Sequence, residues 1–380
     1  MEQQLAMRSC HPIALTLFAM GPFQDKPFRL DFTNKQHESC NLYLLISPNG
    51  RGKTTLLEAM TVLMNLLDRS QPPHPPHERL WSNPQARAQL DLRLTVIMTG
   101  KRREILLTLA AGDGAPHETR SWGVHDLQQV QTEEQLFISW SRSPGGHWKK
   151  IQSQDPLLDE LLGLVSLEME NVYEVFGADQ ITLPSLLYFD AYRDIPLINE
   201  AQSFCRPPEW FYRPSHRFGQ RNDQWQHSLD NLLIWLTWLN DGRYEKCQTL
   251  LNELVFVHTN KALGTINRQY MKARITTGGE EHRLDQLSSS EKSLLQLLLR
   301  IHLHMTTHCF ILIDELDAHL HPKLQHRIYQ ALKRLVVSNP NITLIMTTHA
   351  RELIEVFTAD MKVDAPGLRF GGHLIELDEI

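Results

Sequence analysis

The segment SPNGRGKTT, Ser47 to Thr55, is the most informative part of this 380-residue chain. It follows a continuous apolar run, Leu42 to Ile46, which is typical of a strand buried on both faces. It precedes Leu56 to Leu67, which has the pattern of a helix. Strand, glycine-containing loop and helix in this order predict a phosphate-binding loop. In such a loop Lys53 reaches the β and γ oxygens and the Thr54 hydroxyl faces Mg²⁺.

The loop departs from the usual pattern at its first position. There Ser47 stands in place of a glycine, and serine tolerates a left-handed turn less well, so we expect a remodelled loop entry. The alternative is a chance turn, but such a match arises by accident on the order of once in a thousand chains of this length. We therefore expect ATP with Mg²⁺ to bind through Ser47, Pro48, Asn49, Gly50, Arg51, Gly52, Lys53, Thr54 and Thr55.

The composition argues against several other classes of protein. Hydrophobic residues make up 42%, charged residues 22%, and the net charge is −6, which is ordinary for a globular protein and gives no global preference for polyanions. No run approaches a membrane span, and the N-terminus lacks the layout of a signal peptide. The scattered cysteines argue against a disulfide framework or structural zinc, and for a reducing cytoplasm. They are Cys10, Cys40, Cys205, Cys247 and Cys309.

The pattern along the chain predicts two kinds of sheet. From Leu287 onward helices and strands alternate, which indicates a mainly parallel α/β sheet. Before that, β-like runs separated by turns that contain glycine predict hairpins in an N-terminal layer. The expected strands are Ile13 to Phe18, Phe28 to Phe32, Leu42 to Ile46, Leu90 to Met98, Arg103 to Leu109, Leu136 to Trp140, Trp148 to Ile151, Leu186 to Phe189, Phe310 to Ile313 and Thr343 to Met346. The expected helices are Leu56 to Leu67, Leu157 to Glu170, Leu229 to Leu239, Tyr244 to His258, Glu291 to His304, Lys323 to Val337 and Arg351 to Phe357.

A second motif, FILIDE from Phe310 to Glu315, is an apolar strand that ends in two acids. Asp314 at the carboxyl edge of the sheet would hold Mg²⁺ through water, and Glu315 would orient or deprotonate the attacking water. Taken alone, such a strand end is often a solvated pair of acids. Beside a phosphate-binding loop in the same chain, the metal and catalytic roles are the better interpretation.

Two further motifs complete a recognisable order. LSSSEK, Leu287 to Lys292, opens a helix, and TTH, Thr347 to His349, ends a strand. Together with the phosphate-binding loop and the IDELD segment, this order resembles the ATP-binding-cassette ATPase head of the SMC, RecF and OLD type. The resemblance covers Ile13 to Leu67 and Leu284 to Phe357, and the middle of the chain carries no family motif.

The resemblance implies a site that is shared between two subunits. The helix opened by LSSSEK would cap the γ-phosphate bound by a second subunit, through Ser288, Ser290 and the N–H groups around Glu291. A helix N-terminus with serine hydroxyls suits an anion. Asp317 would lie at the dimer seam, and His349 would contact the γ-phosphate. Ser290 stands where the family usually has glycine, which implies weaker or slower hydrolysis.

Plainer interpretations exist for several of these residues. Serine ahead of a first turn that contains glutamate is a common helix start, and His349 would be a helix cap in that interpretation. The glutamine loop of the family is not identified in the sequence. The strand end Tyr188 to Arg193 faces the same edge, where Arg193 would contact nucleotide or a partner or, as we favour, form a structural ion pair.

The histidines raise a metal hypothesis. His319 and His321 lie in AHLHP, which resembles the stretch after the acidic pair in OLD-like ATPases. His304 and His308 have i, i+4 spacing on the expected helix, a geometry that can bind metal, but no third ligand is evident. We favour packing or solvation for these side chains.

The segment Arg193 to Trp225 is expected to be irregular and interleaves arginines with aromatic residues. Arginine for phosphate and aromatic rings for base stacking would suit nucleic acid. Protein interfaces also favour Arg, Trp and Tyr, and we favour an interface over nucleic acid and over a solvated loop. The residues are Arg206, Trp210, Phe211, Tyr212, Arg213, Arg217, Phe218 and Arg221.

These observations predict an α/β fold of the ABC-ATPase head type. It would have a mainly parallel sheet around the phosphate-binding loop, an N-terminal antiparallel β layer and a helical lobe that carries the signature motif. We divide it into residues 1–193 (loop and β layer), residues 194–299 (helical lobe) and residues 300–380 (acidic pair and switch histidine).

The resemblance extends to ATPase subunits of bacterial anti-phage systems such as Septu, PARIS and retron-associated modules. It implies a cytoplasmic ATPase that dimerises around ATP, hydrolyses it, at a rate that Ser47 and Ser290 would lower, and regulates or scaffolds a separate effector. The effector would be a nuclease or toxin encoded nearby. A RecF-like repair ATPase that binds DNA is the alternative, and a scaffold with little turnover is a third reading.

Overall fold

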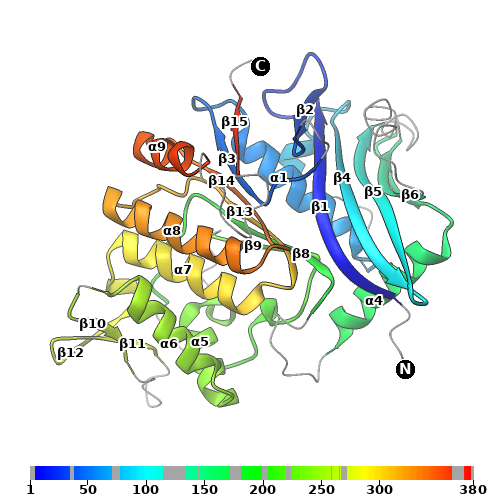
Figure 1. The fold of residues 1–380 in the computed structure, drawn as a ribbon. Helices are drawn as coiled ribbons and strands as arrows, with labels where there is room; N and C mark the ends of the chain where they lie inside the picture. Colours follow the sequence, from blue (N-terminus) through cyan, green and yellow to red (C-terminus); the bar gives the residue numbers. More distant parts are fainter. Residues whose placement is uncertain are drawn as a thin grey trace.

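A computed structural model describes most of the chain. The described residues are 5–34, 38–70, 78–113, 134–143, 145–171, 181–198, 204–219, 224–257, 259–264, 266, 272–361 and 372–377. Three sheets and the helices packed on them make up this part (Figure 1). The described residues include no helix that is long and apolar enough to cross a membrane.

The core sheet contains the strand that leads into the phosphate-binding loop. Its six strands are all paired in parallel. Four of them are buried almost throughout, which explains their continuous apolar sequences. In spatial order they are β15 (His373–Glu376), β3 (Leu42–Ile46), β14 (Thr343–Thr347), β13 (His308–Ile313), β8 (Pro184–Phe189) and β9 (Ser215–Phe218).

Alternate residues of the core strands face two different hydrophobic cores. In β3, Tyr43 and Leu45 belong to one core, whereas Leu42 and Leu44 belong to the other. The first core contains α1 (Lys53–Met64), α4 (Pro156–Glu170) and the N-terminal sheet. The second contains the remaining helices, which are α5 (Leu229–Leu239), α6 (Arg243–Leu254), α7 (Ser289–His304), α8 (Pro322–Ser338) and α9 (Arg351–Asp360). The sheet edge that carries the loop is therefore supported from both sides.

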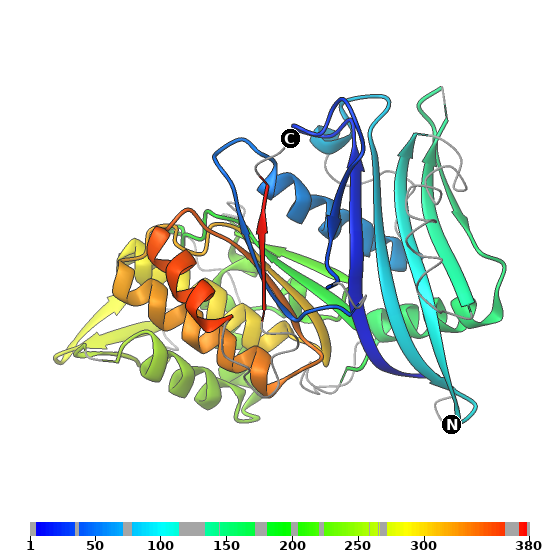
Figure 2. The same cartoon turned by 45° about the horizontal axis from the view of Figure 1, so that its top comes forward.

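The N-terminal sheet packs on the opposite side of α1 (Figure 2). It consists of β2 (Phe28–Asp31), β1 (Leu5–Phe18), β4 (Arg87–Met98), β5 (Lys101–Asp113), β6 (Glu134–Arg142) and β7 (Trp148–Gln152), in this spatial order. Because α1 lies between two sheets, it is buried on nearly all sides, from Leu56 through Met64 with the exception of Glu58. Burial on all sides fixes the helix that starts at the end of the phosphate-binding loop.

The helical lobe comprises α5, α6 and α7 with a small antiparallel sheet. That sheet contains β10 (Lys261–Leu263), β11 (Arg274–Thr277) and β12 (Glu280–Arg283). Its strands follow α6 in the chain and precede α7. The predicted fold class is confirmed: a parallel core sheet, an N-terminal β layer and a helical lobe with the LSSSEK segment at its helix start. The domain boundaries at residues 193 and 299 stay a prediction.

Four details of the sequence interpretation are wrong. The segment from Arg193 to Trp225 is not wholly irregular, because Ser215–Phe218 forms β9; its short polar sequence has no apolar alternation to reveal it. The C-terminal strand β15 was not expected either. The β layer is not purely antiparallel, since β5 and β6 pair in parallel. The i, i+4 pair of histidines is broken, because α7 ends at His304 and His308 begins β13. The sequence SQPPHPPH, Ser70 to His77, is a proline-rich break that cannot continue the helix before it, and residues 71–77 lie outside the described residues.

Tyr43 on β3 links the core sheet to the β layer and gives a test of this arrangement. Its side chain is fully buried, and its hydroxyl donates to the Phe32 carbonyl at 2.6 Å and lies 3.0 Å from the Cys40 carbonyl. We expect Tyr43→Phe to lower the free energy of unfolding by about 1–3 kcal/mol, because buried carbonyls lose their donor. Denaturant unfolding measures this. Tyr192→Phe, at a 43% exposed side chain, is the control and should change stability by less than about 0.5 kcal/mol; equal losses in the two variants would contradict the argument.

Candidate active site

The phosphate-binding loop joins β3 to α1 through a left-handed turn. Gly50 and Gly52 have φ angles of +79° and +90°, and Gly52 is the N-cap of α1. Such angles favour glycine. The loop therefore needs glycine at these two positions, and α1 begins at Lys53, inside the motif.

Lys53 extends into the loop rather than into solvent. Its Nζ donates to the carbonyl of Ser47 at 2.8 Å, to the Ser47 hydroxyl at 3.1 Å and to the Pro48 carbonyl at 3.3 Å. Burial lowers the pKa of Lys53, and the nearby carboxylates of Asp314 and Glu315 act in the opposite direction. The loop thus holds an ammonium group at the position where the motif requires a cation.

The acidic pair meets the loop through a direct hydrogen bond. The Thr54 hydroxyl donates to Oδ2 of Asp314 at 2.6 Å, across a sequence separation of 260 residues. The other carboxylate oxygen, Oδ1, accepts from the Thr347 hydroxyl at 2.8 Å. Asp314 is 3% exposed, so these two hydroxyls stabilise a buried carboxylate. Hydroxyl and carboxylate oxygens are ligands that Mg²⁺ prefers, so this pair fits the predicted metal site.

Glu315 has an unusual backbone. Its φ angle is +46°, which is uncommon for a residue other than glycine. Its N–H donates to the Thr347 hydroxyl at 2.7 Å. The carboxylate is 42% exposed, and its Oε1 lies 3.8 Å from Nε2 of His349. The two residues predicted to act on water and the γ-phosphate are therefore neighbours.

Asp317 is fixed against the end of β14. The Thr348 hydroxyl donates to Oδ1 of Asp317 at 2.5 Å, and the backbone N–H of His349 lies 3.3 Å from the same oxygen. The two threonines of the TTH segment thus donate hydrogen bonds to two different carboxylates, Thr347 to Asp314 and Thr348 to Asp317. The sequence interpretation used only the histidine. The tandem hydroxyls beside an acidic strand end were the signal for these contacts.

The LSSSEK segment forms a helix cap. The Ser288 backbone N–H donates to Oε2 of Glu291 at 3.0 Å, and the Ser288 hydroxyl accepts from the Glu291 N–H at 3.3 Å. Lys261 pairs with the Glu291 carboxylate at 2.8 Å. Burial opposes ionisation of Glu291, yet hydrogen bonds from Lys261 and Ser288 outweigh it and lower its pKa. Ser290 donates to the carbonyl of His319. Both capping and the predicted action on a second subunit fit this geometry, and the second stays a prediction.

Arg193 is more deeply involved than the expected ion pair suggests. It is 3% exposed, and its Nη1 donates to the carbonyl of Asp314 at 2.8 Å. Its Nη2 donates to the carbonyl of Glu315 at 2.9 Å, and its Nε to the hydroxyl of Ser293 at 3.0 Å. The guanidinium thus donates to carbonyl and hydroxyl oxygens. Arg193 joins the acidic pair to α7.

The metal hypothesis for the histidines receives no support. The described residues contain no cluster of three or more His, Cys, Asp or Glu side chains that could hold a metal ion. His304 stacks on His216 and Phe218, and His308 lies 3.3 Å from the Met7 carbonyl, so both pack as favoured. His321 caps α8 by accepting from the N–H of Lys323 at 3.3 Å.

Most of the interleaved arginines and aromatic residues contact their own chain. Arg217 pairs with Glu58 and Asp190, each at 2.9 Å, and Arg206 lies over the rings of Phe211 and Trp235. Arg213 is exposed, whereas Arg221 lies outside the described residues. These contacts weaken the nucleic-acid interpretation for the described arginines.

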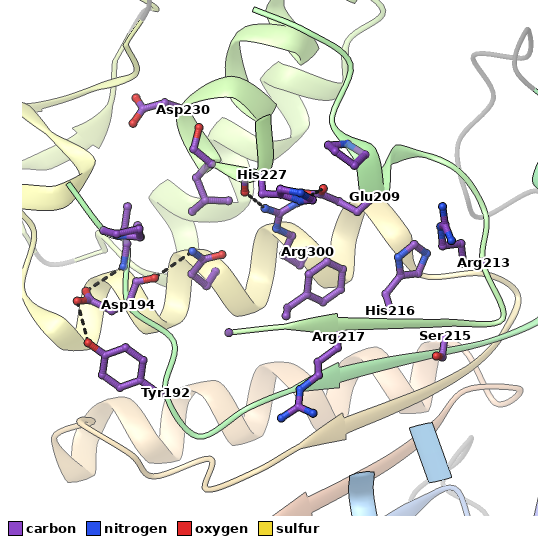
Figure 3. A pocket seen from close by; sticks show the side chains of 18 residues that line it. Tyr192, Asp194, Glu209, Arg213, Ser215, His216, Arg217, His227, Asp230 and Arg300 are labelled. Carbon is purple, nitrogen blue, oxygen red and sulfur yellow. Dashed lines mark hydrogen bonds and ion pairs between the residues drawn. The ribbon is translucent and has the colours of Figure 1, made fainter. Parts of the chain in front are cut away.

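A cavity of about 640 Å³ lies beside β9, between the core sheet and the helical lobe (Figure 3). Arg300 in its wall pairs with Glu209 and donates to the carbonyl of His227 at 2.8 Å. Burial opposes ionisation of Glu209, yet Arg300 and His227 outweigh it and lower its pKa to about 2. Burial lowers the pKa of His216 to about 4, so this ring is neutral at pH 7. The charged side chains that line the cavity are balanced in number. Three are basic (Arg213, Arg217 and Arg300) and three are acidic (Asp194, Glu209 and Asp230).

Comparison with known proteins supports the ATPase interpretation. Residues 179–355, which contain the acidic pair, LSSSEK and TTH, match the family described as "AAA domain, putative AbiEii toxin, Type IV TA system". The chain is 29% identical over 102 residues to the "Retron Vc95 probable ATPase" of Vibrio cholerae serotype O1 biovar El Tor. That alignment covers 24% of this chain and 19% of the relative, so the chain spans about a fifth of that relative's length. The expected resemblance to ATPases of this class is confirmed.

Two solved structures resemble larger parts of the chain. The recombination mediator protein described as RecF-ATPrS of the RecFOR pathway has a TM-score of 0.39 at 11% identity, and the match covers 92% of this chain and 95% of that one. A post-hydrolysis dimer of an ATP-binding cassette bound to ADP and Pi has a TM-score of 0.29 at 12% identity, and covers 92% and 89%.

Gly52 allows a test of the loop geometry that is independent of any ligand. A methyl group there would lie 2.5 Å from Cζ of Phe23 and 2.8 Å from Cγ of Pro22, whereas one on Gly50 would meet nothing within 4 Å. Both glycines have a positive φ, so each alanine variant should lose about 1–2 kcal/mol from backbone strain. We expect Gly52→Ala to lose about 1–3 kcal/mol more, because Phe23 is 1% exposed and cannot yield. Denaturant unfolding of the two variants decides this, and equal losses would contradict the contact.

Proposed function

We propose that this chain binds ATP with Mg²⁺ in the phosphate-binding loop and hydrolyses it to ADP and phosphate. One observation carries the proposal: the hydrogen bond between Thr54 and Asp314, which brings the hydroxyl of the loop to the acid of the distant strand end. In phosphoryl transfer by enzymes with such a loop, a loop hydroxyl and a strand-end carboxylate hold Mg²⁺, so Thr54 and Asp314 would hold it here. The family match and the probable ATPase among its relatives support hydrolysis in general.

Each further residue then has a defined part. Lys53 and the loop N–H groups would hold the β and γ phosphates, with Thr54 and Asp314 on Mg²⁺. Glu315 would accept a proton from the attacking water, and its 42% exposed carboxylate is accessible for that role. His349, 3.8 Å away, would contact the γ-phosphate.

The second part of the proposal is a composite site. Ser288, Ser290 and Glu291 at the start of α7 would cap the γ-phosphate of a second copy of the chain, with Asp317 at the seam. The helix start presents hydroxyls and the positive end of a helix dipole, which supports such a role. ATP would then favour a closed dimer, and loss of the γ-phosphate would release it.

The third part concerns purpose. A retron ATPase among the relatives and the AbiEii-like family description support a regulatory ATPase in bacterial anti-phage defence. Such a protein would restrain or activate a separate effector, a nuclease or toxin encoded nearby, in the cytoplasm. The nucleotide state of the head would set the state of the effector.

Glu315→Gln tests the hydrolysis step. We expect the turnover number to fall by about 10²–10⁴-fold, because the amide cannot accept the proton, while ATP affinity changes little. Steady-state phosphate release and titration with a fluorescent ATP analogue measure the two quantities. The matched control is Glu355→Gln, since Glu355 pairs with Arg351 on the exposed surface of α9 and should leave turnover unchanged.

The variant Glu315→Gln also tests the composite site. Because it should retain ATP, it is expected to accumulate as a dimer with ATP and Mg²⁺, seen by size exclusion with light scattering. Adding Ser290→Arg should prevent this dimer without weakening ATP binding. A wild type that binds nucleotide yet turns over no faster than Glu315→Gln would refute the hydrolase proposal, and a monomer under all conditions would refute the composite site.

Co-expression with the neighbouring genes tests the proposed purpose. We expect a stoichiometric nuclease or toxin to co-purify with the chain in the absence of DNA, and its activity to change when Glu315→Gln replaces the wild type. The RecF-like alternative predicts ATP-dependent DNA binding that weakens steeply with salt instead. DNA binding without a protein partner would reject the effector proposal.

A further inference from the structure

Arg193 occupies a position between the catalytic strand end and the helical lobe. Arg193 donates to the carbonyls of Asp314 and Glu315. Its Nη1 also donates at 2.7 Å to the carbonyl of Asp190, the residue that follows strand β8. The fourth partner is Ser293 on α7, at 3.0 Å. One side chain therefore joins β8, the acidic pair and the helix that begins with the signature motif.

The backbone conformation of Glu315 depends on hydrogen bonds with neighbouring side chains. A non-glycine residue at φ +46° is strained and persists only where its surroundings hold it in place. Thr347 accepts from its N–H at 2.7 Å, and Arg193 donates to its carbonyl at 2.9 Å. The peptide groups on both sides of Glu315 are thus fixed by side chains from other elements. This determines the direction in which its carboxylate leaves the backbone.

The loop around Arg193 is also attached to α7 at further points. Asp194 pairs with Lys292 at 3.1 Å, and the amide of Gln296 donates to the Asp194 carbonyl at 3.2 Å. Figure 3 shows the hydroxyl of Tyr192 beside Asp194 in this loop. Lys292, Ser293 and Gln296 all lie in the first half of α7, so the loop is bonded to this helix at three positions. Arg193 is then rigidly placed when it reaches the acidic pair.

An arginine suits this position better than another cation. Its planar fork carries five N–H donors, which can serve several carbonyl oxygens at once. Burial lowers the pKa of Arg193 to about 10, while Asp314, Asp317, Glu315 and Asp190 oppose the shift, so the side chain stays charged at neutral pH. A lysine ammonium could supply the charge, but it has no planar fork that directs donors toward several fixed positions.

We propose that Arg193 is a positioning residue for the hydrolytic reaction, which holds Glu315 in its strained conformation and ties it to α7. The proposal rests on the proposed function, because Glu315 acts only if ATP is hydrolysed. It assigns Arg193 no contact with nucleotide. A loss of Arg193 should therefore lower the turnover number and leave nucleotide affinity nearly unchanged.

Arg193→Met and Arg193→Lys test this. We expect both variants to lose about 10²-fold in turnover number, since a misplacement of about 1 Å at a reacting group has that effect. KM and the affinity for an ATP analogue should stay within about threefold of wild type, and lysine should not restore activity.

Ser293→Ala removes a single hydrogen bond to Arg193, so it should fold normally and lose roughly fivefold in turnover number. The matched control is Arg300→Met, at another buried arginine (4% exposed) that pairs with Glu209 away from the acidic pair. Arg300→Met should have the same turnover number per folded molecule as the wild type.

A double variant separates positioning from general damage. If Arg193 acts through Glu315, Arg193→Met should cause less than about a twofold further loss in the Glu315→Gln background. A full further loss there, a raised KM alone, or rescue by lysine would overturn the proposal. Absence of turnover in the wild type would overturn it together with the proposed function, whereas an active wild type with an equally active Arg193→Met would overturn this proposal alone.

Discussion

The hydrogen bond between Thr54 and Asp314 is the contact on which the rest of the site depends. It joins the start of α1 to the end of β13 at 2.6 Å, although the residues are 260 positions apart. Asp314 is nearly fully buried, and a buried carboxylate is costly unless it is hydrogen-bonded. Thr54 supplies one of those bonds from helix α1, and Thr347 supplies the other from strand β14. The fold therefore places the candidate metal ligands together and stabilises their charge with the same contacts.

This arrangement requires both ends of the chain. Strand β3, from the first fifty residues, pairs in parallel with β14 and β15, which lie some three hundred residues later. Helix α1 is then enclosed by the N-terminal sheet, and Phe23 packs directly against Gly52. Non-local pairing of this kind forms late in folding because loop closure must be achieved first. The strand that leads into the phosphate-binding loop is therefore held in the sheet by strands from the other end of the chain.

The sequence predicted the core sheet and the order of the motifs well, because long apolar runs and glycine-containing turns depend on local physics. Strand β3 and helix α5 have the expected bounds, and the acidic pair lies at the expected strand end. The role of Arg193 could not be assigned, because its partners include backbone carbonyls and a side chain of elements far away in the chain. The same limit explains β9, whose polar residues Ser215 to Arg217 form a strand only because β8 provides its neighbour. Patterns of local sequence do not carry such pairings.

The serines that depart from the family pattern have uses within one chain. Ser47 accepts a hydrogen bond from Lys53 through both its carbonyl and its hydroxyl, so the loop entry provides a contact that glycine would supply only through its backbone. Ser290 donates to the carbonyl of His319, a residue with a φ angle of +61° beyond the acidic pair. That bond attaches the first turn of α7 to the turn after Asp317, one helical turn from the bond between Ser293 and Arg193. Both hydroxyls on α7 thus stiffen the link between the signature helix and the acidic pair. A glycine at position 290 would remove one of these two links, so the serine strengthens the coupling between α7 and the acidic pair within one chain.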